Sequence, residues 1–84
     1  MATVRLRLFA AARDAAGCAS ATVDGRSLGD VLDHARAVYG TPFSAILERS
    51  RVWVNGDEPA DGSATVLVDD DEIAVLPPVS GGRS

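Results

Sequence analysis

The chain contains no lysine, and its eight basic residues are all arginine. Twelve acidic residues outnumber them and give a net charge of −4, which argues against nucleic acid because phosphate binding needs clustered basic side chains. Long hydrophobic runs are also missing: none approaches the ~20 apolar residues of a membrane span, and no signal peptide opens the chain. The composition therefore predicts a protein that binds neither nucleic acid nor membrane.

Cysteine and histidine are nearly absent as well, with one of each at Cys18 and His34. A single cysteine forms no internal disulfide, which fits a reducing cytoplasm. Metal-ligand spacing is missing, and the acidic run Asp69–Glu72 lacks the alternating oxygens of a calcium loop. No base accompanies Cys18, and Asp30 and His34, four residues apart, are interpreted as a surface pair. We therefore expect no metal, no tightly bound cofactor and no catalytic residues.

Eighty-four residues allow one domain, which we place at residues 1–80, with a flexible tail at 81–84. Hydrophobic periodicity predicts its elements. The expected strands are Thr3–Phe9, Ser20–Val23, Arg51–Val54, Ala64–Val68 and Ile73–Leu76. One main helix is expected between the N-cap Ser27 and Gly40, with short helical turns at Ala10–Ala16 and around Phe43. Asn55-Gly56 is a turn signal.

The order of these elements is strand, strand, helix and three strands, which is the order in a ubiquitin-like β-grasp. The expected fold is α+β: a mixed five-stranded sheet packed on one main helix, with short extra helical turns. Strand alternation turns one face of the sheet toward the helix and the other toward water. The residues expected to face inward are Val4, Leu6, Leu8, Val52, Val54, Ile73 and Val75.

The same alternation gives the outward face of the sheet a set of apolar and basic side chains. This set, the outer-face patch, consists of Phe9, Trp53, Leu76, Arg5, Arg7 and Arg51. Its three apolar members are expected on strands that are neighbours in the centre of the sheet. Aromatic and arginine side chains are typical of interface centres, so we predict that the patch docks protein partners. Alternatively, loops or the tail partly cover Trp53.

The C-terminal segment is unusual in composition. Pro77-Pro78 favours a stiff, extended exit from the last strand, and Gly81-Gly82 carries no side chain that would block a narrow channel. Val79 and Ser80 lie between these pairs, so residues 78–81 would thread such a channel and present the carbonyl of Gly82 at its end. Composition alone is equally compatible with a frayed terminus.

These residues carry a resemblance to a known family. Pro77-Pro78-Val79-Ser80-Gly81-Gly82 resembles the end of the small ubiquitin-like sulfur carriers. Phe9-Ala10-x-x-Arg13-x-x-x-Gly17 resembles the segment after the first strand in the small subunit of molybdopterin synthase. Val54-Asn55-Gly56 is similar to the third-strand turn of that subunit, and residues 70–78 are similar to the run into its tail. The resemblance covers most of the chain and extends to the thiamin-biosynthesis sulfur carrier.

The resemblance implies a sulfur carrier and not an enzyme. In that family an adenylating enzyme, similar to ubiquitin-activating enzymes, uses ATP to activate the terminal glycine carboxylate, and sulfur then displaces AMP to give a thiocarboxylate. Gly82 would carry the sulfur here, and the large subunit of molybdopterin synthase would use it. Other acceptors stay open: thiamin, cysteine or secondary-metabolite synthesis. A ubiquitin-like protein modifier and an interaction module without carrier function are also open.

One departure from the family concerns the end of the chain. Arg83-Ser84 follow Gly82, and a peptide-bonded Gly82 has no free carboxylate to adenylate. Three explanations are open: the two residues were added for expression, a peptidase removes a native extension, or the carrier function has been lost.

Overall fold

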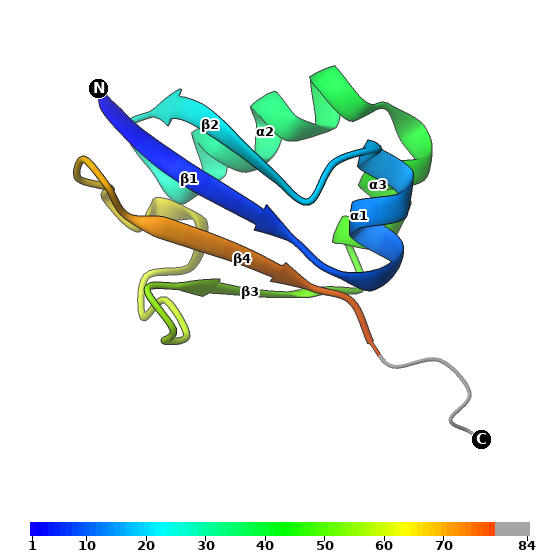
Figure 1. Cartoon of the computed structure of the whole chain (residues 1–84). Coiled ribbons are helices and arrows are strands. Elements are labelled where there is room, and N and C mark those ends of the chain that lie inside the picture. Colours follow the sequence, from blue (N-terminus) through cyan, green and yellow to red (C-terminus); the bar gives the residue numbers. More distant parts are fainter. Residues whose placement is uncertain (79–84) are drawn as a thin grey trace.

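The computed structural model describes residues 1–78, in which helices cover one face of a single mixed sheet (Figure 1). The strands are β1 (Ala2–Leu8), β2 (Ser20–Gly25), β3 (Arg51–Val54) and β4 (Glu72–Leu76). The helices are α1 (Ala10–Ala16), α2 (Leu28–Tyr39) and α3 (Thr41–Leu47), with a 3₁₀ turn at Gly62–Ala64. The α+β prediction is confirmed. The expected boundary at residue 80 and the tail at 81–84 lie outside the described residues.

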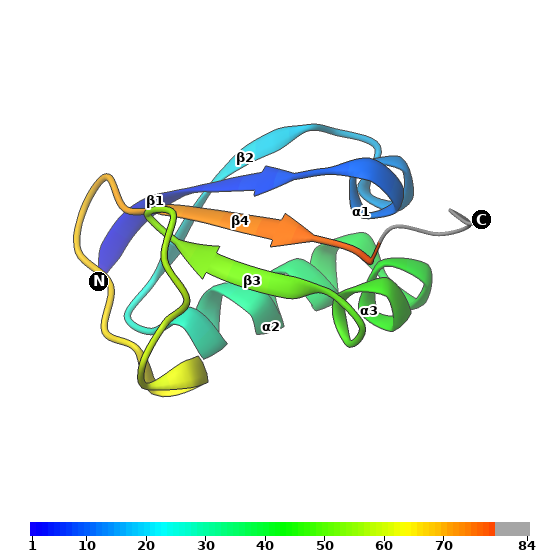
Figure 2. The same ribbon diagram turned by 90° about the horizontal axis from the view of Figure 1, so that it is seen from below.

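The sheet has the order β2-β1-β4-β3, so β1 and β4 are its central strands. β1 pairs antiparallel with β2 and parallel with β4, and β3 pairs antiparallel with β4. Parallel strands need a long connection, and the chain between β1 and β4 includes α2, which crosses beneath the sheet from the β2 edge toward the β3 edge (Figure 2). The carboxyl end of β4 therefore lies in the middle of the sheet, at the end where α1 and α3 pack.

The expectation of five strands is wrong: the described residues form four. Residues 64–68 make a single bridge, between Val66 and Ser27, in place of a strand in the sheet. Leu67 is buried, whereas Val66 and Val68 are 78% and 62% exposed. The alternation in this segment is therefore real, but the segment pairs with the loop that precedes α2. The backbone N–H of Leu67 donates to the carbonyl of Arg26 at 2.9 Å.

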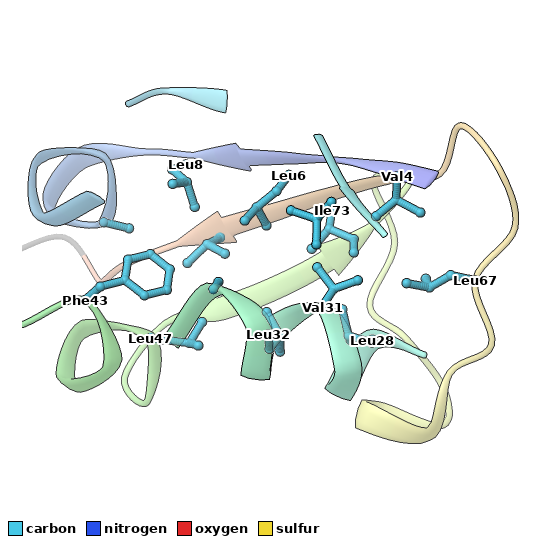
Figure 3. Close-up of a cluster of buried hydrophobic side chains, with 14 of the residues drawn as sticks. Val4, Leu6, Leu8, Leu28, Val31, Leu32, Phe43, Leu47, Leu67 and Ile73 are labelled. Carbon is cyan, nitrogen blue, oxygen red and sulfur yellow. The ribbon is translucent and has the colours of Figure 1, made fainter. Parts of the chain in front are cut away.

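The expected alternation is confirmed in the two central strands. Every second residue of β1 is buried, from Ala2 to Leu8, while Arg5 and Arg7 are exposed. Ile73 and Val75 of β4 are buried as well. On β3, Val52 and Val54 are partly buried and pack against the same core. Figure 3 shows the inward side chains of β1 directed toward those of α2 and α3, such as Val31, Leu32 and Phe43.

A capping box begins the main helix at the predicted residue. The backbone N–H of Asp30 donates to the Ser27 hydroxyl at 3.2 Å, and the Asp30 carboxylate accepts from the backbone N–H of Ser27 at 3.3 Å. Asp30 and His34 are both exposed, and the Asp30 carboxylate is a helix cap. Gly40, with φ +86°, ends the helix as predicted. Within residues 1–78 no helix is long and apolar enough to cross a membrane.

Candidate functional site

The register of the sheet places the outer-face patch across three strands. Ala74 of β4 pairs with Arg7 on one side and with Trp53 on the other, which makes one row. Leu76 pairs with Arg51 in the next row. The two arginines are exposed, whereas Leu76 is partly buried. The structure therefore brings these residues together on the face opposite α2, as the alternation predicts.

Phe9 extends this surface past the end of β1. It is the N-cap residue of α1, and its side chain is 38% exposed. The guanidinium carbon of Arg7 lies 5.6 Å from the centroid of the Phe9 ring, a cation–π distance. Arg7 also lies 3.5 Å from the Glu72 carboxylate. Arg7 is therefore held between an aromatic ring and a carboxylate at the centre of the outward face.

Trp53 departs from the expectation in two ways. It lies on β3, an edge strand of the sheet, so the expectation that all three apolar members lie on central strands is wrong. Its side chain is only partly exposed, and the alternative that loops or the tail partly cover it stays a prediction. The indole N–H is buried and has no hydrogen-bond acceptor among residues 1–78. The exposed apolar part of the patch is therefore smaller than the sequence suggests.

A surface hollow of about 430 Å³ lies where β4 leaves the sheet. It is lined by Arg49, Arg51, Leu76, Pro77 and Pro78. Sequence reasoning missed Arg49, because this residue lies in the turn after α3, where strand alternation makes no prediction. The hydrogen bond from the backbone N–H of Arg49 to the carbonyl of Ile46, 3.1 Å long, holds that turn in place. Residues 79–82, predicted to thread a partner and to carry the sulfur, lie outside the described residues.

The contacts of Asn55 show the structural role of the motif Val54-Asn55-Gly56. Its backbone has φ +53° and is followed by Gly56 with φ +85°, so the predicted turn is confirmed. Its side-chain amide donates to the Asp71 carboxylate at 2.9 Å, and its side-chain oxygen accepts from the backbone N–H of Glu72 at 2.9 Å. Hydrogen bonds from the Val68 backbone N–H and then from Asn55 lower the pKa of Asp71. The motif thus joins the end of β3 to the start of β4.

The other residues considered from the sequence are the acidic run Asp69–Glu72 and Cys18, and both make contacts within the fold. In the acidic run, Asp69 accepts a hydrogen bond from the backbone N–H of Thr3 at 2.9 Å. Within the part of the chain that the structure describes, no three His, Cys, Asp or Glu side chains are grouped so that they would hold a metal ion. Cys18 lies between α1 and β2, partly buried beside the phenol of Tyr39. A phenol is not a base at neutral pH, so this neighbour gives the thiol no evident activation.

These features define a small domain that presents an outward sheet face and a C-terminal segment leaving its central strand. Comparison with known proteins identifies the class of protein to which such a domain belongs. The ThiS family matches residues 6–82, and the chain belongs to this family of small ubiquitin-like sulfur carriers. The family's members are small carriers or modifiers, not catalysts.

Solved structures confirm the ubiquitin-like β-grasp fold. Small archaeal modifier protein 1 from Methanosarcina acetivorans is 34% identical, with a TM-score of 0.86 over 98% of each chain. Its counterpart from Haloferax volcanii is 28% identical, with a TM-score of 0.80 over 95% of this chain and 99% of that one. The complex of subunits 1 and 2 of molybdopterin-converting factor from Helicobacter pylori contains a chain that is 22% identical. Its TM-score is 0.72 over 95% of this chain and 99% of that one.

Proposed function

We propose that the chain is a sulfur carrier whose Gly82 carboxylate is adenylated and then converted to a thiocarboxylate. We further propose that it supplies this sulfur as the small subunit of molybdopterin synthase. The observation that carries the proposal is that the family match runs to residue 82, the second glycine of the pair. The fold supports it, because β4 leads from the centre of the sheet into Pro77-Pro78 and from there toward Gly82.

In the proposed reaction, partner enzymes catalyse both the adenylation of Gly82 and the transfer of sulfur to it. A carboxylate is a poor electrophile, so ATP first converts it to an acyl adenylate, with pyrophosphate as the leaving group. A sulfur nucleophile then attacks the Gly82 carbonyl carbon, and AMP leaves with the electron pair of the broken C–O bond. The chain's own part is to dock the partner with its outward face and to present an unbranched end. ATP is held by the activating enzyme.

Two features support molybdopterin synthesis as the pathway. The motif Phe9-Ala10-x-x-Arg13 is present, and the structure places Phe9 at the start of α1 with its ring on the outward face beside Arg7. The chain also shares its fold with a subunit of the Helicobacter pylori complex. The partners in this proposal are a ubiquitin-activating-like enzyme, the large synthase subunit and, if Arg83-Ser84 are native, a peptidase. All of them would act in the cytoplasm.

A second candidate function is protein modification. It is favoured by the 34% identity with small archaeal modifier protein 1 from Methanosarcina acetivorans. The activation step at Gly82 is the same, and the functions differ in the nucleophile: sulfur in a carrier, a target lysine amine in a modifier. This chain has no lysine, so its own copies offer no side-chain amine. Carriers for thiamin, cysteine or secondary metabolites would share the activation step as well.

Adenylation tests the proposal. The chain ending at Gly82 is incubated with the activating enzyme of the same organism and ATP, and acyl-adenylate formation is followed by ATP–pyrophosphate exchange. We expect exchange with residues 1–82 and none with residues 1–84. Gly82→Ala should slow exchange strongly, because the added Cβ lies next to the reacting carbon. Ser63→Ala, at an exposed position beside Gly29 near the start of α2, is the matched control. Equal exchange with an intact 1–84 chain would contradict the proposal.

A further inference from the structure

The hollow at the end of β4 is lined by three apolar residues and two arginines. The apolar residues are Leu76, Pro77 and Pro78, and the arginines are Arg49 and Arg51. Arg51 is the β-sheet partner of Leu76, which puts it directly beside the last residue of β4. Figure 2 shows how the chain passes from α3 into β3 next to the end of β4. The hollow is therefore built by the elements that carry the chain out of the sheet.

The positive charge of the hollow has no counterpart within the domain. Among residues 1–78, no carboxylate lies within ion-pair distance of Arg49 or Arg51, whereas Arg7, Arg13 and Arg36 each have one. This is a basic site on a chain whose net charge is −4. Charge complementarity at interfaces places carboxylates opposite such groups. The chemistry of the hollow therefore favours an acidic side chain flanked by apolar atoms.

The short distance along the chain from Pro78 to Gly82 indicates which partner protein supplies this acidic side chain. Gly82 is the fourth residue after Pro78, and an extended chain spans at most about 3.5 Å per residue, or about 14 Å over these four steps. Any protein that reacts at Gly82 therefore has surface within about 14 Å of Pro78, one of the residues that line the hollow. The activating enzyme is such a protein, and both candidate functions require it.

We propose that the hollow is a docking site for an acidic residue of the activating enzyme, which forms ion pairs with Arg49 and Arg51 while adjacent apolar atoms pack on Leu76 and Pro77. This inference rests on the proposed function, because it takes the partner from the adenylation step. Arg51 and Leu76 already belong to the outer-face patch, and the inference extends that docking surface to Arg49 and Pro77 and specifies its contact as ion pairs with an acidic residue.

Affinity for the activating enzyme tests the ion pairs. The double variant Arg49→Gln/Arg51→Gln, in the 1–82 chain, should bind at least about tenfold more weakly than the unaltered chain, with a shallower dependence on salt. Both arginines are exposed, so the fold should be retained, which circular dichroism checks. The matched control is Arg26→Gln, an exposed arginine beside Val66, at the other end of the sheet. It should bind like the unaltered chain.

The absence of lysine permits a second, direct measurement. Arg51→Lys introduces the only side-chain amine of the chain, and a carbodiimide joins amines to carboxylates in direct contact without a spacer. Mass spectrometry of the digested complex should identify a peptide from the activating enzyme joined through Asp or Glu to position 51. Arg26→Lys should give no such product.

The inference is overturned if Arg49→Gln/Arg51→Gln binds as tightly as the unaltered chain, or if the amine at position 26 is coupled and that at position 51 is not. Failure of the proposed function has a different signature: the 1–82 chain binds the enzyme but supports no ATP–pyrophosphate exchange. In that case the affinity comparison still decides the docking site. If the unaltered chain shows no binding to the enzyme, both are overturned.

Discussion

The sulfur of Cys18 lies 3.4 Å from the hydroxyl oxygen of Tyr39, which joins the connection between α1 and β2 to the end of α2. The Tyr39 ring also packs on Phe43 of α3, with 5.1 Å between the ring centroids. The hydrogen bond with Cys18 and, to a smaller extent, burial raise the pKa of Tyr39 from its ordinary value of 10.0 to about 12. The one thiol of the chain therefore takes part in a structural contact between elements.

This contact predicts a loss of stability at alkaline pH. Because the pKa of Tyr39 is higher in the folded state, its contribution to the free energy of unfolding is complete below pH 10.0 and is lost as the pH rises toward about 12. Tyr39 is the only tyrosine, so phenolate absorbance reports it alone. Cys18→Ala should move the midpoint of this titration down toward 10.0. An unchanged midpoint in the Cys18→Ala variant would contradict the assignment.

Cys18 is predicted to take no part in sulfur transfer. Its neighbour is the phenol of Tyr39, which is not a base at neutral pH and therefore does not generate the thiolate. Cys18→Ser should therefore form the Gly82 thiocarboxylate at an unchanged rate when it is compared with the unaltered 1–82 chain at a temperature where both are folded. A folded Cys18→Ser variant that no longer forms thiocarboxylate would show that the thiol acts as a relay.

Asn55 is predicted to stabilise the domain both by its side chain and by its tolerance of a positive φ. Asn55→Ala removes the hydrogen bonds to Asp71 and Glu72. It also places alanine, which tolerates a positive φ less well than asparagine, at φ +53°. Together these changes should lower the free energy of unfolding by about 1–3 kcal/mol. Asn55→Gly loses the same hydrogen bonds without that strain and should cost less. Denaturant unfolding measures both. Equal costs would show that backbone strain contributes nothing.

The docking role of the outward face is tested at Trp53. Trp53→Ala should leave unfolding cooperative and should weaken binding to the activating enzyme and to the large subunit by about 2 kcal/mol or more, the scale of an interface hot spot. Val38→Ala is the matched control, because Val38 is an apolar residue of α2 with 59% exposure. If Trp53→Ala instead unfolds the domain while its folded fraction binds normally, Trp53 belongs to the core.

Local patterns predicted the elements well, and pairing between distant segments was harder to predict. The alternation of β1 and the cap at Ser27 depend on neighbouring residues, so the sequence alone placed them. Residues 64–68 alternate like a strand, but the partner of Val66 is Ser27, a choice that depends on the folded chain. The same limit applies to Trp53: alternation indicates its face, but not that β3 lies at the edge. The sequence did not indicate Arg49 as a site residue, because only the tertiary structure brings its turn to the end of β4.

The most direct test of the central claim is the intact mass of the 1–82 chain after co-expression with the activating enzyme and sulfur donor of the same organism. The account predicts a mass increase equal to the replacement of one oxygen by sulfur, located by fragmentation at Gly82 and absent from the Gly82→Ala variant. A chain that remains unchanged in mass under conditions where the activating enzyme is active would contradict the carrier function. A chain recovered joined to lysine side chains of other proteins, without any thiocarboxylate, would contradict it in favour of a protein modifier.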